Sequence, residues 1–158
     1  MKTFLLNKEN KPIIPWGSLG DNIFFEGNVP DGYSLACSPG NSNIIILDVD
    51  TKHGKNGFLN IPNKQFLEIE KTFNYYTKSG GKHYFLKYTG NKTLLNTSTK
   101  LALDLRIGSK PKNAGGYVRY YHHTDIRQCI HLINETSSEL NQWLEELFCA
   151  VNRDESKL

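Results

Sequence analysis

Apolar and polar residues alternate along the chain with two periods, which indicates a mixture of strands and helices. The run Asn43–Asp50 is apolar and β-branched and is bounded by turn residues. This pattern predicts a strand buried on both faces in the middle of a sheet. Shorter patterns predict further strands at Tyr33–Cys37, Tyr75–Ser79, Lys82–Tyr88, Leu101–Ile107, Tyr117–Tyr121 and Cys129–Ile133.

Two segments have helical spacing instead. Asn63–Phe73 places Phe66, Ile69 and Phe73 on one face. The second helix follows a capping box at Thr136-Ser-Ser-Glu139. Its apolar residues form one stripe typical of core packing: Leu140, Trp143, Leu144, Leu147, Phe148 and Val151. Hairpins mixed with two helices favour an α+β fold over a doubly wound sheet.

The size and composition are those of a single globular domain spanning residues 1–158. Met1–Leu6 is followed at once by polar residues, and no apolar run approaches the roughly 20 residues that cross a bilayer. We therefore expect a cytoplasmic protein with no membrane partner. The cysteines are Cys37, Cys129 and Cys149, whose wide spacing predicts buried or semi-buried thiols and no zinc site.

The net charge of +3 conceals a strong asymmetry. Between Lys78 and Arg119 there are nine basic residues and a single acid, Asp104. Such a segment is either a solvated face or an electrostatic footprint for phosphate or nucleic acid. The lone acid within it requires an explanation.

Asp48 and Asp50 stand two residues apart at the end of the apolar run Asn43–Asp50. In a strand both carboxylates leave the same face, with Cα atoms roughly 6.5–7 Å apart. Their mutual repulsion raises the pKa of each, and a divalent cation removes that cost. Oxygen ligands of this kind suit Mg²⁺ or Mn²⁺. The alternative is a pair of solvent-facing acids at a strand end.

Asp104 lies within the predicted strand Leu101–Ile107 and shares a face with Ala102 and Arg106. An aspartate in mid-strand is unfavourable by propensity, so a compensating interaction is expected. One interpretation is a surface ion pair with Arg106 or a lysine. The other makes Asp104 a third metal ligand, with Arg106 meeting a substrate phosphate.

Gly80 and Gly81 predict a two-residue hairpin that places Lys78 opposite His83 on the same face. The glycines allow a phosphate to approach backbone N–H groups. The segment supplies the groups that we expect to bind nucleotide phosphate: Ser79, Gly80, Gly81, Lys82 and His83. The alternative for His83 is an ordinary packed or surface residue.

These pieces fit phosphoryl transfer, in which a protein mainly positions groups and neutralises charge, here with two divalent ions. No P-loop, dinucleotide-binding glycine motif or Ser-His-Asp arrangement competes with this interpretation. His122, His123 and Asp125 suggest either an extra metal site or an exposed loop.

Three motifs in order resemble the archaeo-eukaryotic primase superfamily, specifically the primase-polymerase domains of plasmids, phages and mobile elements. The motifs are Asp48-Val-Asp50 followed by residues 51–57, Ser79-Gly-Gly-Lys-His-Tyr-Phe85, and Leu103-Asp-Leu-Arg-Ile-Gly108 followed by Gly115-Gly-Tyr-Val118. Lys11-Pro-Ile-Ile-Pro-Trp16 is also similar to the family's N-terminal segment. The resemblance covers about residues 11–121.

The resemblance implies a two-part catalytic core with an RRM-like sheet and an active-site cleft between the parts. It implies template-directed nucleotide addition in DNA replication, with Asp48, Asp50 and Asp104 as ligands of two Mg²⁺ or Mn²⁺ ions. His83 would contact the phosphates of the incoming nucleotide, and we assign Lys52 and Arg106 to nucleotide binding as well.

The partners expected from the resemblance are a single-stranded DNA template and NTP or dNTP, with a replicative helicase in cis or in trans as a further candidate. No helicase or downstream helical domain is expected in this chain. After Tyr117-Val118 the family often has a Pro-Pro-Ser segment, but here the sequence is Arg119-Tyr-Tyr-His-His123, which leaves substrate selection open.

Two rival functions remain at this stage. A non-catalytic module with the same fold would bind single-stranded nucleic acid tightly and salt-sensitively without incorporating nucleotides. A two-metal nuclease would degrade a strand rather than extend it. The Gly-Gly-Lys-His hairpin favours a nucleoside triphosphate substrate over the nuclease.

Overall fold

The computed structural model describes residues 1–108 and 115–149, which form two sheets and two α-helices. The larger sheet has six strands, with β9 paired to β5 beside the strand order β4-β5-β3-β7-β6. Its strands are β3 (Ile44–Val49), β4 (Asn74–Tyr76), β5 (Lys82–Lys87), β6 (Thr97–Ser98), β7 (Leu103–Arg106) and β9 (Asn134–Glu135). The smaller sheet has the order β1-β2-β8 and consists of β1 (Lys2–Leu6), β2 (Ser34–Ser38) and β8 (Val118–Arg119).

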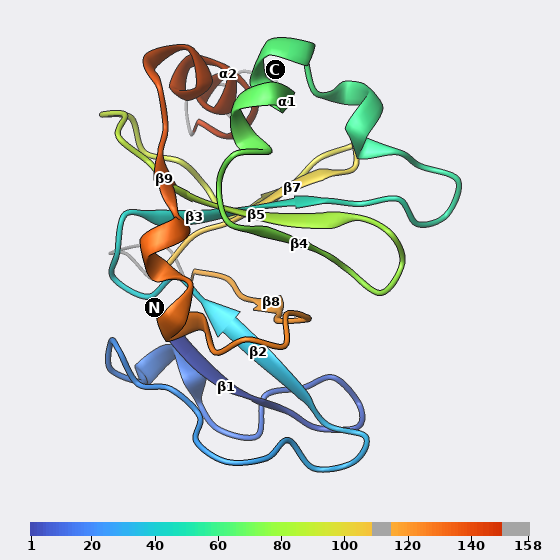
Figure 1. The fold of residues 1–158 in the computed structure, drawn as a ribbon, viewed down its shortest axis with the longest axis vertical. Helices are drawn as coiled ribbons and strands as arrows, with labels where there is room; N and C mark the ends of the chain where they lie inside the picture. The colour runs from blue at the N-terminus through green and yellow to red at the C-terminus, as the bar shows by residue number, and fades with distance from the viewer. Residues whose placement is uncertain (109–114, 150–158) are drawn as a thin grey trace, which may run out of the picture.

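The helices α1 (Asn63–Ile69) and α2 (Ser138–Phe148) cover one face of the larger sheet, and the smaller sheet lies on its other side (Figure 1). Short 3₁₀ turns complete the fold: η1 (Trp16–Ser18), η2 (Gly57–Asn60), η3 (Ile126–Gln128) and η4 (Ile130–Leu132). This mixture of antiparallel strands and helices agrees with the predicted α+β class. None of the described helices combines the length and hydrophobicity that a membrane-spanning segment needs.

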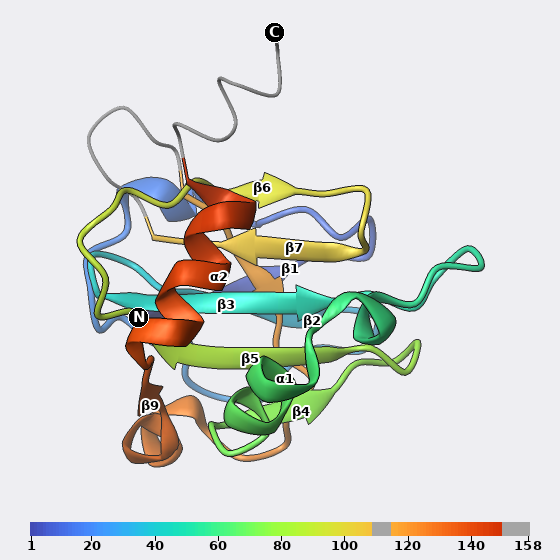
Figure 2. The same ribbon diagram turned by 90° about the horizontal axis from the view of Figure 1, so that it is seen from above.

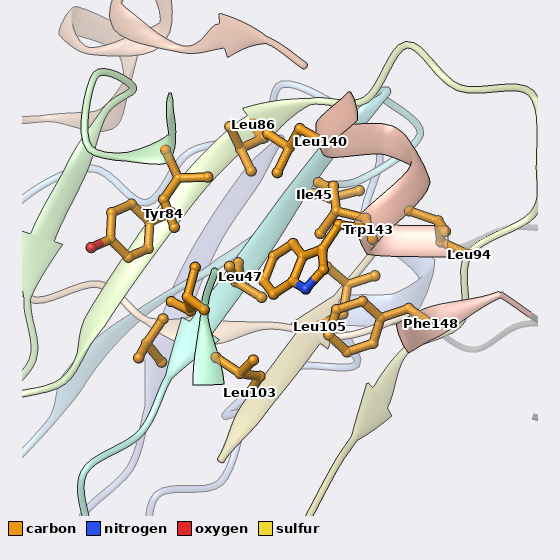
Figure 3. Packing of buried hydrophobic residues seen from close by; sticks show 14 of the residues in the cluster. Ile45, Leu47, Tyr84, Leu86, Leu94, Leu103, Leu105, Leu140, Trp143 and Phe148 are labelled. Carbon is orange, nitrogen blue, oxygen red and sulfur yellow. The ribbon is translucent and has the colours of Figure 1, made fainter. Parts of the chain in front are cut away.

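The main core lies between α2 and the larger sheet. Leu140, Trp143, Leu144 and Phe148 of α2 pack against alternate residues of β3, β5 and β7. Figure 3 shows Leu140, Trp143 and Phe148 lying over the strand residues. The apolar stripe predicted for this helix is therefore confirmed, apart from Val151, which lies outside the described residues. Figure 2 shows α2 crossing above the sheet strands that it covers.

The central strand β3 is buried on both faces, as predicted. Its odd-numbered residues face the helices, whereas Ile44 and Ile46 pack with Phe85 toward the smaller sheet. Val118 and Tyr120 belong to this second cluster. The two sheets are thereby joined by apolar packing at the end of β3 that carries Ile44 and Ile46. The polar residue Asp48 lies toward the other end of this strand.

Several predicted elements are shorter or different. Helix α1 ends at Ile69, and Phe73 packs in the cluster on the other face of the sheet, away from Phe66 and Ile69. The reason is that the chain turns after the helix to enter β4. Thr72 Oγ1 donates to the Phe85 carbonyl (2.6 Å), and Phe73 N donates to a carbonyl of η4 (3.0 Å).

The strand predicted at Cys129–Ile133 is wrong, because this segment forms the 3₁₀ turn η4, which follows directly on η3. The Asp125 side chain accepts a hydrogen bond from Arg127 N (2.9 Å), which begins the first turn, and Cys129 has helical dihedral angles. All three cysteines are buried and free, as expected.

The predicted capping box is also different. The N-cap of α2 is Ser137, whose side chain accepts from Leu140 N, and its own N–H donates to the Glu68 carboxylate of α1 (2.9 Å). Glu139 was expected to accept from Thr136 N, which instead donates to the Lys87 carbonyl (2.9 Å). Thr136 instead accepts from Thr89 N (3.0 Å).

The hairpin between β4 and β5 has a longer loop than predicted. Gly80 N donates to the Thr77 carbonyl (3.1 Å), and Thr77 N donates to the Gly81 carbonyl (2.8 Å). Gly80 has a positive φ of 93°, which glycine adopts without strain and which makes it the bulge residue of a three-residue loop. Consequently Tyr75, not Lys78, lies opposite His83.

The predicted strands Leu101–Ile107 and Tyr117–Tyr121 are present in shortened form as β7 and β8. Ala102 has a left-handed φ of 58°, so the strand begins only at Leu103. The glycine-rich turn predicted at residues 114–116 falls partly outside the described residues.

Candidate active site

Cross-strand pairing aligns one row of side chains over the larger sheet. Asp48 on β3 lies directly opposite His83 on β5 and directly opposite Asp104 on β7. The row continues to Tyr75 on β4 and to Ser98 on β6. Residues directly opposite each other share a face of the sheet, so the three predicted motifs meet on the face that looks toward the smaller sheet.

Asp50 follows the end of β3, two residues beyond Asp48. Its N–H donates to the Ala102 carbonyl (2.9 Å), and its carbonyl accepts from Gly57 N (2.9 Å). One carboxylate oxygen accepts from Lys52 N (2.9 Å) and so closes the turn that leaves the strand. These contacts fix the backbone of Asp50 between two loops at the end of the sheet.

His83 is held from both sides. Its Nδ1 lies 2.8 Å from the Tyr75 hydroxyl, and its Nε2 lies 3.3 Å from Asp48 Oδ1. The Tyr75 hydroxyl also donates to the Arg119 carbonyl (3.1 Å) on β8, and burial raises its pKa, so that it stays protonated. With its side chain only 5% exposed, the His83 ring is fixed by these partners.

Asp104 lies close enough to Asp48 and Asp50 for their charges to act on its carboxyl group. Burial raises the pKa of Asp104, and the negative charges of Asp48 and Asp50 raise it further. The Arg106 guanidinium, 3.7 Å from Oδ2, and the Thr99 N–H, 3.2 Å from Oδ1, act in the opposite direction. Both sequence interpretations of Asp104 therefore have a structural basis, because it pairs with Arg106 and also lies beside Asp48.

A polar cavity of ≈ 420 Å³ opens over this row. One wall carries acids and His83 from the larger sheet, and the facing wall is β8 with its flanking residues. The lining residues are Asn10, Asp48, Asp50, Lys52, Thr77, Ser79, His83, Arg106, Tyr117, Val118, Arg119 and Tyr121. Thr51 Oγ1 donates to the Ser79 carbonyl (2.9 Å), which ties the loop after β3 to the β4–β5 hairpin at this end of the sheet.

Comparison with known protein families gives a match over most of the chain. Residues 15–143 match the family described as "Bifunctional DNA primase/polymerase, N-terminal". The chain belongs to the primase-polymerase family. The match includes every residue of the row and most of α2, and it confirms the resemblance inferred from the three motifs. No curated protein matches the chain.

Most residues predicted to bind nucleotide in this primase-polymerase chain do line the cavity. Lys52, Ser79, His83 and Arg106 lie there with Asp48 and Asp50, whereas Asp104 lies just behind Arg106 in the sheet. Gly80 and Gly81 are not among the lining residues. A Cβ at Gly81 would be 2.1 Å from the Val49 carbonyl oxygen, so this glycine serves the close approach of two chain segments.

We predicted that Lys82 binds nucleotide, but its side chain lies on the face of the sheet opposite to the cavity. It is 8% exposed, and its ammonium group lies 3.0 Å from Glu70 Oε2 and 3.2 Å from Asn74 Oδ1. The Tyr76 ring covers it, with 4.5 Å between Nζ and the ring centroid. Neighbouring strand residues face opposite sides, so Lys82 and His83 cannot both reach the cavity.

The facing wall of the cavity consists of residues that were not predicted as site residues from the sequence. Tyr117, Arg119 and Tyr121 alternate along the strand and its flanks, and all three line it. Tyr121 lies over His83, with 6.2 Å between ring centroids. The signal was present in the alternate spacing of these residues and in the departure from the family's usual Pro-Pro-Ser segment.

The remaining predicted features are dispersed. The basic residues between 78 and 119 do not share one face, since Lys82 is buried beneath the helices while Arg106 and Arg119 line the cavity. Asp125 pairs with Arg127 and the His122 and His123 rings stack 4.8 Å apart, so this segment resembles a loop. Within the described residues, no three His, Cys, Asp or Glu side chains form a ready-made metal-binding group.

Proposed function

We propose that this chain catalyses template-directed nucleotidyl transfer, in which the 3′-hydroxyl of a strand is joined to an incoming nucleoside triphosphate. The observation that supports it is the row in which Asp48 pairs directly with both His83 and Asp104. Three acids and an oriented imidazole beside a cation-lined cavity are the groups that such a reaction needs. We further propose that the larger sheet is the RRM-like part of a two-part core and that this cavity is its active-site cleft.

The side chains present fit divalent metal ions by their donor chemistry. Carboxylate oxygens are the ligands that Mg²⁺ and Mn²⁺ prefer, and Asp48 and Asp50 offer them at the cavity wall. Burial raises the pKa of Asp104, and the charges of Asp48 and Asp50 raise it further; a cation would remove the repulsion between these three carboxylates. We assign Asp48, Asp50 and Asp104 as the ligands, with Asp104 exchanging its contact with Arg106 for a metal ion.

Metal ions bound there would supply positive charge to the attacking hydroxyl and to the transferred phosphate. In the reaction, the O3′–Pα bond forms while the bond from Pα to the bridging β-phosphate oxygen breaks. Pyrophosphate leaves with the electron pair, and the hydroxyl proton passes to water. Lys52, Arg106 and Arg119 line the cavity and neutralise the charge that accumulates on the phosphates and on the leaving pyrophosphate.

The place of His83 defines its role in this scheme. Its ring is oriented by Tyr75 on one side and by Asp48 on the other, so the ring edge is presented at the floor of the cavity. With Asp48 held by a metal ion, the Nε2–H of this fixed ring would be free to donate to a triphosphate oxygen without a cost of ordering at the moment of reaction. Ser79, on the hairpin tied to Thr51, adds a hydroxyl donor at the cavity rim.

The test is primer extension on a DNA template, and synthesis without a primer, each with Mg²⁺ or Mn²⁺ and with NTPs or dNTPs. Asp50→Asn is the informative variant because its amide oxygen can still accept the hydrogen bond from Lys52 N that closes the turn. We expect incorporation to fall by at least about 10²-fold, the scale of losing one preorganised electrostatic contact. Asp31→Ala, at an exposed aspartate outside the cavity, should behave as wild type.

Each rival function has its own outcome in the same assay. Shortening of the labelled strand by the wild type, abolished in Asp50→Asn, would establish a nuclease. Salt-sensitive binding of single-stranded DNA with no incorporation under any condition would establish a binding module. Equal incorporation by wild type and Asp50→Asn would refute the metal-ligand assignment.

The proposal also defines the partners: a single-stranded DNA template, NTP or dNTP, and a replicative helicase in cis or in trans. The replication of a phage, plasmid or other mobile element is the context in which we place the reaction.

A further inference from the structure

A second cavity adjoins the first at the other end of the acidic row. It has a volume of ≈ 460 Å³ and is lined by Trp16, Asn96, Ser98, Arg106, Gly115, Gly116 and Tyr117. Arg106 and Tyr117 line both cavities. Ser98, which lies directly opposite Asp104, belongs to the second cavity, so the Asp104–Arg106 pair stands between the two.

The two cavities differ in chemistry. The first is lined by Lys52, Arg106, Arg119 and His83, which suits a ligand with several negative charges. In the second, Arg106 is the single cation among the lining residues, and Asn96 and Ser98 are neutral hydrogen-bonding groups. Such a lining suits a sugar, a base and one phosphate rather than a triphosphate.

The second cavity also has a rigid aromatic wall. The Trp16 ring stacks on Phe4, with centroids 5.4 Å apart and planes 10° apart, and Tyr117 contacts both rings edge-on. Phe4 is 1% exposed, so this group is anchored in a small core of its own. Fixed aromatic side chains beside polar groups are the usual means of holding a nucleobase by stacking.

Gly116 keeps the wall between Asn96 and Arg106 open. A Cβ on Gly116 would lie 2.2 Å from Asn96 Oδ1 and 2.9 Å from Arg106 Cδ. Any larger residue would push these two side chains from their positions. The absence of a side chain here therefore preserves both the cavity and the place of Arg106 beside Asp104.

Nucleotidyl transfer requires two bound nucleotides whose reacting atoms come within about 3–3.5 Å of each other. The attacking nucleotide must therefore occupy a space contiguous with that of the triphosphate. Two other cavities in the described part of the chain, one around Lys71 and His131 and one around Phe25 and Ile126, share no lining residue with the first. The cavity beside Trp16 does.

We propose that the second cavity binds the nucleotide that carries the attacking 3′-hydroxyl, with its base against Trp16 and Tyr117. This inference rests on the proposed nucleotidyl transfer and locates its second substrate. The same chemistry is offered by the terminal nucleotide of a primer and by a free initiating nucleotide, and the experiments below separate these two sources.

The first experiment measures binding without catalysis. The chain has two tryptophans, and Trp143 is buried in the main core, so Trp143→Phe isolates the fluorescence of Trp16. Primer-template DNA with a 3′-hydroxyl end should quench Trp16, and Ser98→Phe, which fills the cavity from an exposed strand position, should weaken this binding at least 10-fold. Thr93→Phe, at an exposed site outside both cavities, is the matched control.

The second experiment measures turnover with both sources of the hydroxyl. Ser98→Phe should raise the KM for primer-template at least 10-fold while changing the KM for the incoming dNTP less than 3-fold. A parallel loss of unprimed dinucleotide synthesis would show that the initiating nucleotide uses the same site, and its retention would restrict the site to primer ends.

The two proposals can fail separately. Quenching of Trp16 that is lost in Ser98→Phe, in a protein that incorporates no nucleotide, would refute the reaction and leave a strand-binding site. Normal incorporation by Ser98→Phe with an unchanged KM for primer-template, or a Trp16 signal that DNA does not alter, would refute the second site and leave the reaction standing.

Discussion

The partly buried Lys82–Glu70 pair provides a direct test of whether Lys82 serves the fold or the nucleotide. The side chains of Lys82 and Glu70 are 10% and 34% exposed, and the Tyr84 hydroxyl donates to the same carboxylate (2.6 Å). The two variants Lys82→Met and Glu70→Gln should therefore have unequal effects. Removing the carboxylate leaves a buried ammonium without its counter-charge, whereas removing the ammonium leaves a carboxylate that keeps Tyr84 and partial solvation.

The magnitudes follow from these exposures. Breaking a buried ion pair by removing one partner costs about 3–5 kcal/mol, and partial exposure of Glu70 together with the retained Asn74 contact reduces this to about 2–3 kcal/mol for Glu70→Gln. Lys82→Met should cost about 1–2 kcal/mol, since it loses charge-assisted hydrogen bonds but also relieves a buried charge. For a chain of this size the loss of about 2–3 kcal/mol lowers the unfolding midpoint by about 4–12 °C, and the loss of about 1–2 kcal/mol lowers it by about 2–8 °C.

Acid should remove this contribution in a defined direction. Burial alone would raise the pKa of Glu70, but hydrogen bonds from Tyr84 and Lys82 outweigh it and hold the pKa below its ordinary value of 4.5. A carboxyl whose pKa is lowered in the folded state stabilises the protein at pH values above its pKa in the unfolded state. This stabilisation is lost as the pH falls through the pKa in the folded state. The difference between wild type and Lys82→Met should therefore shrink below pH 4.5.

The assay is thermal unfolding followed by circular dichroism from pH 3 to pH 8, together with nucleotide binding at pH 7. Lys64→Met is the control, because its pair with Glu139 is 73% and 59% exposed and should be worth less than about 1 kcal/mol. A Lys82→Met protein with unchanged stability and a 10-fold weaker affinity for nucleotide would refute the structural role and restore the role predicted from the sequence.

Three further outcomes are expected. Asp104→Asn should abolish incorporation yet stabilise the metal-free protein by about 0.5–2 kcal/mol at pH 7, because the wild-type carboxyl has a raised pKa. Since ionisation of that carboxyl opposes folding, the gain should fade toward pH 3.8 in thermal melts with chelator. Tyr75→Phe, which frees the ring of His83, should lower kcat about 10-fold with a smaller change in KM for primer-template, as steady-state kinetics can show. Burial raises the pKa of Cys37 to about 12, so iodoacetamide at pH 8 should label it only after unfolding, as mass spectrometry can detect.

The sequence predicted the elements that carry the site because their signals are local. The continuous β-branched run before Asp48 correctly predicted a strand buried on both faces, and residues of period two around Asp104 correctly predicted a strand with one polar face. What could not be read from the sequence was the register, since β3 pairs with partners far along the chain. The Gly80-Gly81 hairpin shows the consequence, because a three-residue loop in place of a two-residue loop put Tyr75 opposite His83.

Other errors had different physical origins. The placement of Lys82 beside His83 in one site ignored the alternation of strand faces, and this error was avoidable from the sequence. The segment Cys129–Ile133 is too short for its apolar residues to distinguish a strand from a 3₁₀ turn. Ser137 caps α2 locally through Leu140 N, but the acceptor of its own N–H is Glu68, from a helix that is distant in sequence, and no local motif could reveal that contact.

Because Asp48 pairs directly with residues of two neighbouring strands, the arrangement of the site depends on the register of three strands. A deletion or insertion of one residue within β3, β5 or β7 would rotate every later side chain of that strand to the other surface of the sheet. Such a change would put a carboxylate or an imidazole among the leucines beneath α2 and would deliver a leucine to the substrate. Length changes in homologues should therefore fall in the connecting loops and not in these three strands.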